Sequence, residues 1–132
     1  MTIAALLIAV LCVGALAWMN TPERKTMRFV SKHSAVLADI LDHEQPIPSA
    51  LSGKYYNAWD AEHPMDEFIL YVRGETYYGC YYSPDDVPLA FQNCSVPLIE
   101  NGKDCWEWNG QGDNRGTTKR IADKWYYFEA SF

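Results

Sequence analysis

The chain has 132 residues and a formal net charge of −6 at pH 7, a length that fits one domain with a short appendage. Residues 1–19 carry no charged side chain, whereas residues 51–132 carry seven Lys or Arg and thirteen Asp or Glu, which account for the whole net charge. Because an acidic surface repels phosphate backbones, nucleic acid is not expected as a partner.

The uncharged run Ile3–Met19 predicts a helix about 25 Å long, at about 1.5 Å per residue. That length approaches a bilayer core of about 30 Å, and Trp18 suits the membrane interface at its end. A cleavable signal peptide is the alternative, because Ala15-Leu16-Ala17 resembles a cleavage site, but no Lys or Arg precedes the run. We therefore expect a retained single-pass anchor, with residues 1–21 as the transmembrane half of an N-terminal helix.

Residues 22–45 predict an amphipathic second half of the same helix. Apolar residues recur at near-helical spacing and would form one face of the helix: Met27, Val30, Val36, Leu37, Ile40 and Leu41. Charged residues occupy its other faces. Pro22 lacks a backbone N–H, so a kink or local melting is expected there. Gln45-Pro46 ends the helix, because the residue before a proline avoids the α region. The expectation is one helix of about forty residues, half in lipid and half amphipathic.

The orientation of this anchor is read in two opposite ways. Four basic residues follow the apolar run directly: Arg24, Lys25, Arg28 and Lys32. By the positive-inside rule they place the C-terminal domain in the cytoplasm. The cysteines and the acidic, Tyr- and Trp-rich domain fit the outside better. A charged leader that once preceded Met1 and has been removed would reconcile the two readings, so we expect an extracytoplasmic domain.

Residues 46–67 are expected to form a connecting loop, and residues 68–132 a β-rich domain with a C-terminal loop. Four runs predict strands: Phe68–Arg73, Thr76–Tyr82, Val96–Ile99 and Lys124–Ser131. Gly74-Glu75 joins the first two as a hairpin turn. A sheet of three or four antiparallel strands needs one face covered, and the amphipathic helix provides that cover. The predicted fold class is α+β.

The four cysteines divide between the two parts of the chain. Cys12 lies in the apolar run, where a thiol behaves as a small hydrophobe. Cys80, Cys94 and Cys105 lie in the polar domain, so at most one internal bridge forms there. We favour Cys94 with Cys105, because they bracket a short loop. A bridge requires an oxidising compartment, and in the cytosol all three would be reduced.

No residue pattern predicts catalysis or a cofactor, so the chain is not expected to be an enzyme. The three histidines, His33, His43 and His63, form no set with Ser, Cys or a metal-ligand spacing. One loop is crowded with acidic and imidazole groups: Asp60, Glu62, His63, Asp66 and Glu67. Such a loop could hold a divalent ion, although a solvated acidic loop explains it more simply.

Aromatic doublets are the other notable feature: Tyr55-Tyr56, Tyr77-Tyr78, Tyr81-Tyr82 and Tyr126-Tyr127. Neighbouring residues of a strand point to opposite faces, so each doublet is expected to place one ring in the core and one outward. Outward rings suit contact with a glycan or a protein partner. The simpler alternative is that they suit a half-buried sheet.

The N-terminal segment resembles that of mature type IV pilins and pseudopilins. Those proteins begin with Phe or Met, then Thr, then an uncharged apolar helix with a central glycine and a later proline. This chain has Met1, Thr2, Gly14 and Pro22 at the matching places. The family also packs the second half of its helix on an antiparallel sheet, often closes a C-terminal loop with a disulfide, and loses a basic leader by proteolysis.

The resemblance implies a structural, non-enzymatic subunit of an extracellular pilus-like filament, held in a bacterial inner membrane before assembly. Assembly would use Met1, Ala5, Gly14 and Pro22, and the partners would be copies of the chain or related subunits. The family usually has a glutamate where this chain has Ala5, although some minor, tip-located pseudopilins also lack it. This departure weakens the expectation of a long homopolymer. The alternatives are an accessory subunit of a membrane complex and a membrane-tethered, aromatic-rich binding module.

Overall fold

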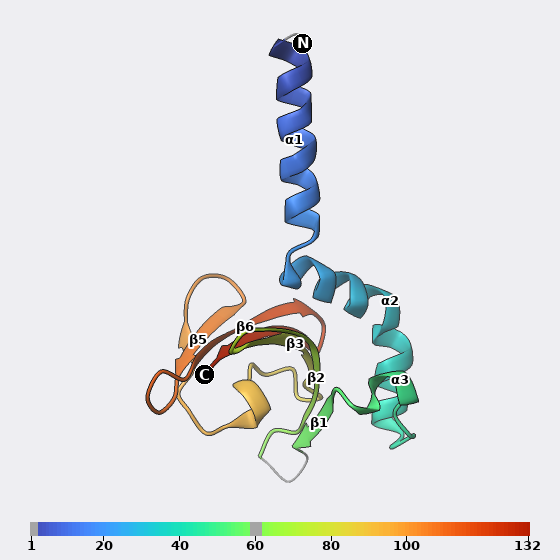
Figure 1. Ribbon diagram of the computed structural model, residues 1–132. Helices are drawn as coiled ribbons and strands as arrows, with labels where there is room; N and C mark the ends of the chain where they lie inside the picture. The colour runs from blue at the N-terminus through green and yellow to red at the C-terminus, as the bar shows by residue number, and fades with distance from the viewer. Residues whose placement is uncertain (1–2, 59–61) are drawn as a thin grey trace.

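A computed structural model describes residues 3–58 and 62–132 and has an α+β fold. The helices are α1 (Ile3–Met19), α2 (Pro22–Asp42), α3 (Ser49–Ser52) and the 3-10 turn η1 (Phe91–Asn93). The strands are β1 (Tyr55–Ala58), β2 (Met65–Arg73), β3 (Thr76–Tyr82), β4 (Ile99–Glu100), β5 (Cys105–Asn109), β6 (Arg115–Ala122) and β7 (Trp125–Ser131). They form one antiparallel sheet in the order β1-β2-β3-β7-β6-β5-β4. In Figure 1, α1 stands clear of the sheet domain while α2 lies along it.

The N-terminal helix is broken, and the prediction of one continuous helix is wrong. The axes of α1 and α2 differ by 62° across a short break. Thr21 has an extended backbone (φ −65°, ψ 150°) and caps α2, its hydroxyl accepting from the Arg24 N–H at 3.4 Å. Pro22 is the first helical residue, where no backbone N–H is needed. The expected disruption at Pro22 is confirmed, but it starts a new helix instead of bending the old one.

The sheet is covered on both faces. On one face α2 places Val30, Leu37 and Leu41 against a cluster from three strands: Phe68, Cys80, Tyr82 and Trp125. On the other face the segment 83–98, with Leu89 and Phe91, covers Met65, Tyr81, Tyr126, Phe128 and Ala130. This second cover was not predicted, because residues 83–95 have neither helical nor strand periodicity.

The double cover overturns the expected arrangement of the aromatic doublets in the central strands. Tyr81 and Tyr82 are both buried, and so are Tyr126 and Tyr127. Neighbouring rings do point to opposite faces, as expected, but each face is packed. Tyr56 on the edge strand β1 is 38% exposed and remains the clearest outward ring.

The hairpin of β2 and β3 and the C-terminal strand β7 are confirmed. Segment 46–67 is more structured than a connecting loop, because it holds α3, β1 and the start of β2. The sheet also gains β5 and β6. The strand expected at 96–99 is not formed over 96–98, and only Ile99 belongs to a strand, the two-residue β4 (Ile99–Glu100). The sheet therefore has more strands than the sequence indicated.

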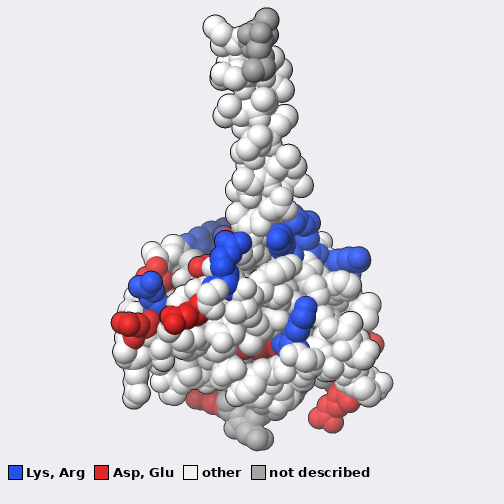
Figure 2. Space-filling view, viewed as in Figure 1, with Lys and Arg blue, Asp and Glu red and all other residues white. Residues whose placement is uncertain are grey.

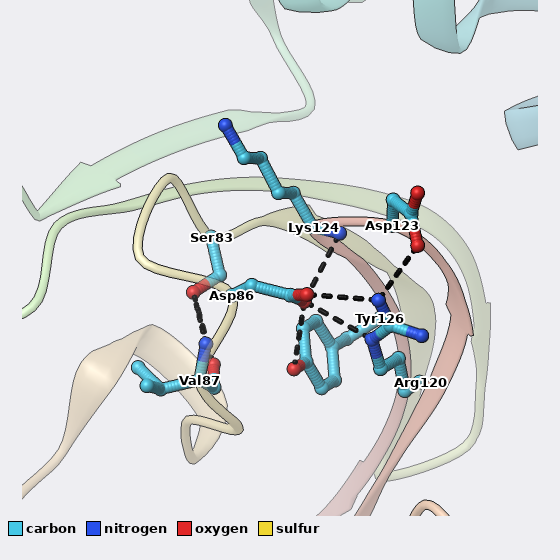
Figure 3. Close-up of polar contacts among 7 residues, drawn as sticks. All are labelled: Ser83, Asp86, Val87, Arg120, Asp123, Lys124 and Tyr126. Carbon is cyan, nitrogen blue, oxygen red and sulfur yellow. Dashed lines mark hydrogen bonds and ion pairs between the residues drawn. The ribbon is translucent and has the colours of Figure 1, made fainter.

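Asp86 fastens the covering segment to the sheet (Figure 3). Its carboxylate accepts from Arg120 Nε at 3.1 Å and Nη2 at 2.8 Å, from the Lys124 N–H at 3.0 Å and from the Tyr126 hydroxyl at 3.1 Å. The hydrogen bonds from Arg120 are the main reason that the pKa of Asp86 lies below its ordinary value. One carboxylate thus ties the turn after β3 to the β6–β7 hairpin.

Candidate functional site

Helix α1 presents an apolar surface that nothing else in the described chain covers. None of its residues is buried, and its large side chains are exposed from 48% at Met19 to 81% at Ile3. Ala5 and Gly14, two of the predicted assembly residues, lie within this helix, whereas Met1 lies outside the described residues. A Cβ added at Gly14 would meet no atom within 4 Å, so packing within the chain does not require this glycine. Small residues of this kind let a second helix approach closely.

No single helix of the described chain is both long enough and apolar enough to cross a bilayer by itself. Helices α1 and α2 meet the criterion of length and composition only as a pair bent by 62°.

The break between the helices is held by side chains from the start of α2. Arg28 Nη1 donates to the carbonyl oxygen of Met19 at 2.7 Å, and the Thr21 hydroxyl donates to that of Trp18 at 3.0 Å. Both carbonyls belong to the last turn of α1, where the i+4 donor of a continuing helix is missing. The Trp18 carbonyl also accepts from the Thr21 N–H at 3.4 Å. The Arg24 guanidinium lies 3.5 Å from the centre of the Trp18 ring, a cation–π contact. Pro22, the fourth predicted assembly residue, lies at this junction.

Five cations from three elements gather around the junction, and we call them the basic collar: Arg24, Lys25, Arg28, Arg73 and Lys119. Lys25 Nζ lies 5.5 Å from the centre of the Tyr71 ring, and Lys25 and Arg73 line one shallow cavity of about 130 Å³. Lys119 on β6 pairs with Glu23 at 2.6 Å. Figure 2 shows Lys and Arg side chains around the base of α1. The sequence pointed to the members on α2 but not to Arg73 and Lys119, which only the sheet register brings there.

A second feature is a cavity of about 390 Å³ next to the segment that covers the sheet. Aromatic and amide side chains dominate its lining: Tyr56, Phe91, Trp108, Phe132, Gln92, Gln111 and Asn114. Trp108 is held against Gly116, where an added Cβ would lie 2.4 Å from the indole ring. The sequence pointed to Tyr56 through its aromatic doublet, whereas Phe91 and Phe132 gave no signal.

The described residues of the acidic loop do not assemble into an ion site. Asp60 lies outside the described residues, and among the described ones no group of three or more His, Cys, Asp or Glu could hold a metal ion. Asp66 accepts from the Tyr55 hydroxyl, while Glu67, its neighbour in β2, accepts from the Gln92 N–H at 2.9 Å. His63 instead pairs with Asp85 at 2.9 Å.

Glu67 is a buried carboxyl with a strongly raised pKa. Burial raises its pKa to about 8, partly offset by the hydrogen bond from Gln92. Its Oε1 is buried and has no hydrogen-bond partner among the described residues. A protonated carboxyl at neutral pH removes the cost of an isolated buried charge.

The cysteines are free thiols in this structure, so the Cys94–Cys105 bridge remains a prediction. Cys80 is completely buried, and burial raises the pKa of its thiol. Cys94 is exposed and Cys105 half-buried, while Cys12 lies exposed on α1. The features that stand out are therefore the bare helix with its basic collar and the aromatic cavity. No protein-family model, curated protein or solved structure matches this chain.

Proposed function

We propose that the chain is a non-enzymatic structural subunit whose helix α1 is inserted in a membrane and whose sheet domain is displayed at the membrane surface. The observation that carries this proposal is that every residue of the apolar helix α1 is exposed. Helix α2 buries Val30, Leu37 and Leu41 on the sheet, as an amphipathic helix of a folded domain does. Helix α1 has no such face, and covering apolar surface is favourable by about 25 cal/mol per Å².

We further propose that copies of the chain, or related subunits, associate through α1 in a pilin-like filament. Small residues support this step, because they allow close helix packing where lipid gives no hydrophobic drive: Ala4, Ala5, Ala9, Gly14, Ala15 and Ala17. The location that follows is a bacterial inner membrane first and an extracellular filament afterwards. Ala5 in place of the usual glutamate favours a minor subunit over the main component of a long homopolymer.

Membrane insertion is tested by two matched charge substitutions. Leu11→Arg places a cation in the middle of α1, and Val36→Arg places one on an exposed position of α2 that is 64% exposed. We expect wild type and Val36→Arg to float with phospholipid vesicles and to resist alkaline extraction, and Leu11→Arg to be released. A wild-type chain that stays in the soluble fraction would contradict insertion.

Association through α1 is tested with the native Cys12. Mild oxidation of membranes that contain a Cys94→Ser variant should yield dimers linked through Cys12, because Cys12 is exposed on α1. The double variant Cys12→Ser/Cys94→Ser is the control for background crosslinking. Ala9→Leu in the Cys94→Ser background should reduce the yield by blocking close approach of the helices, because Ala9 lies three residues before Cys12 and on the same face of α1. An equal yield with Ala9→Leu would contradict helix packing at this face.

The aromatic cavity favours a second candidate function, a membrane-tethered module that binds neutral glycans. Tyr56 and Phe132, which are 38% and 40% exposed, offer ring faces for the C–H groups of sugars. Gln92, Gln111 and Asn114 offer amide hydrogen bonds. Titration with neutral oligosaccharides should change the Trp fluorescence at millimolar concentration, and Phe132→Ala should abolish the change. No response of the wild-type chain at millimolar sugar would contradict this second function.

A further inference from the structure

The cations of the basic collar lie at the depth where α1 would leave a membrane. Trp18, which the Arg24 guanidinium touches at 3.5 Å, is in the last turn of α1, and Trp rings prefer the interface between hydrocarbon and headgroups. Arg28 reaches the Met19 carbonyl at the end of the same helix. If α1 is inserted, the collar therefore lies level with lipid headgroups.

We propose that the basic collar binds the headgroups of anionic phospholipids and holds the sheet domain flat against the membrane surface. This proposal rests on the proposed insertion of α1 and goes beyond it, since a helix anchor alone leaves the domain free to tilt. The ligand class is a bilayer surface that carries phosphate groups with a net negative charge.

Most of the collar keeps an unneutralised positive charge. Among the residues that the structure describes, Lys119 alone of the five has a carboxylate partner, Glu23. Arg24 and Lys25 lie over the rings of Trp18 and Tyr71, and none of Arg24, Lys25, Arg28 and Arg73 is among the ion pairs of the described residues. Cations in such places remain available to headgroup phosphates. Each Lys or Arg near an anionic leaflet raises the equilibrium constant for binding of the domain to the membrane surface by about five-fold.

The distribution of charge over the molecule gives the contact a direction. The chain as a whole is acidic, with a net charge of −6, so its other surfaces repel an anionic membrane. Figure 2 shows Lys and Arg gathered near the base of α1 and acidic side chains lower on the domain. This uneven distribution of charge favours the orientation in which the junction of α1 and α2 faces the lipid.

The geometry favours a surface over a small anion. The collar residues come from α2, β2 and β6 and stand around the base of a helix instead of converging on one deep cavity. The cavity that Lys25 and Arg73 share is only about 130 Å³. A membrane surface offers many phosphates and can meet several of these side chains at once, which a single free phosphate cannot.

The test compares the full chain in nanodiscs of phosphatidylcholine with the same chain in nanodiscs that also contain phosphatidylglycerol. Hydrogen–deuterium exchange reports α1 and the collar separately. We expect α1 to be protected in both lipids, and residues 22–30 and 71–74 to gain protection only with phosphatidylglycerol. High salt should remove that gain, because exposed charges are screened.

The variant Lys25→Gln/Arg73→Gln should weaken the phosphatidylglycerol-dependent protection by about 25-fold, because it removes two cations that each contribute about five-fold. The matched control is Lys54→Gln/Lys103→Gln, two exposed cations outside the collar, which should leave it unchanged. Equal protection of the collar in both lipids, with α1 still protected, would overturn the headgroup contact while leaving the anchor intact. An unprotected α1 in both lipids would overturn the anchor, and the headgroup contact with it.

Discussion

Lys119 Nζ lies 2.6 Å from the Glu23 carboxylate and joins β6 to the first turn of α2 across 96 residues of sequence. Both side chains are partly exposed, so the pair contributes about 1 kcal/mol or less to stability. Its larger consequence is geometric. It ties the first turn of α2, close to the point where α1 leaves the domain, to strand β6 of the sheet.

Thr21→Ala should destabilise the start of α2. The change removes the hydroxyl that accepts from the Arg24 N–H and donates to the Trp18 carbonyl, and loss of such a cap costs about 1 kcal/mol. Chemical denaturation of the full chain in detergent, followed by circular dichroism, measures the loss. Thr21→Ser keeps the hydroxyl and should behave as wild type. Equal stability of the Ala variant would show that water replaces the cap without loss.

Asp86→Asn should destabilise the domain by about 1–2 kcal/mol, because it weakens the charge-assisted hydrogen bonds from Arg120. Asn tolerates the positive φ of 52° at this position, so the effect reports the charge. Asp123→Asn is the matched control: Asp123 also accepts from Arg120 but is 95% exposed, and its loss should cost about 0.5 kcal/mol or less.

The Asp86 carboxylate should also make the stability of the domain depend on pH. The pKa of Asp86 is lower in the folded chain than its ordinary value of 3.8. Its contribution to stability is therefore present above about pH 4 and is lost as the pH falls through the lowered folded value. Denaturation measured from neutral to acidic pH should show a smaller acid-induced loss for Asp86→Asn than for wild type. Curves that stay parallel down to acidic pH would contradict the assigned role.

Gly79→Ala should unfold the domain or cost about 3 kcal/mol or more. A Cβ at Gly79 would lie 1.9 Å from the carbonyl oxygen of Phe68 and 3.0 Å from the Phe128 ring. The clash is with backbone of the paired strand, which cannot move aside without breaking the β2–β3 ladder. Gly53→Ala is the control, since its Cβ would meet no atom within 4 Å. Thermal unfolding of both variants measures the difference, and similar midpoints would contradict the close approach.

The sequence predicted the parts of the fold that local patterns determine. The β2–β3 hairpin follows from two β-prone runs around Gly74, and the apolar stripe of α2 follows from helical periodicity. The separate helices could also have been foreseen, because Thr21-Pro22 is a typical helix start. Strand β6, with Arg115, Lys119 and Arg120, is too polar to stand out, and the cover by segment 83–98 depends on tertiary contacts alone.

Some features of the candidate site could likewise be predicted from local sequence patterns, and others depend on the tertiary fold. The bare apolar helix is evident from composition, and the cations of α2 are evident from their position after it. Arg73 and Lys119 join them only because the antiparallel register brings β2 and β6 near the start of α2, which no local pattern encodes. The aromatic cavity likewise gathers residues from β1, η1, β5 and the C-terminal end.

The Cys94–Cys105 bridge is tested by the intact mass of the chain isolated from its own cells, before and after reduction. We expect a gain of two hydrogens on reduction, and a linked peptide pair that contains Cys94 and Cys105. Cys80→Ser should retain the pair, since the Cys80 thiol is completely buried, while Cys105→Ser should lose it. Three free thiols in the sheet domain would contradict both the bridge and an extracytoplasmic location.

Glu67 should make stability depend on pH in a second, separate window. Burial raises the pKa of Glu67 in the folded chain to about 8, from an ordinary value of 4.5. Between these values the folded chain holds a proton that the unfolded chain releases, so the free energy of unfolding falls as the pH rises. At most, the unfolding equilibrium shifts by about ten-fold per pH unit.

Glu67→Gln should flatten this dependence. The amide oxygen can still accept from the Gln92 N–H, which the Glu67 carboxyl accepts at 2.9 Å, and the amide does not titrate. Denaturation at closely spaced pH values from about 4.5 to 8 compares the two chains, with Asp123→Asn as a control for general charge effects. The window lies above the one assigned to Asp86, so the two carboxyls are resolved in one series. Parallel curves for wild type and Glu67→Gln would show that Glu67 is ionised in the folded chain and that water or another group satisfies its buried oxygen.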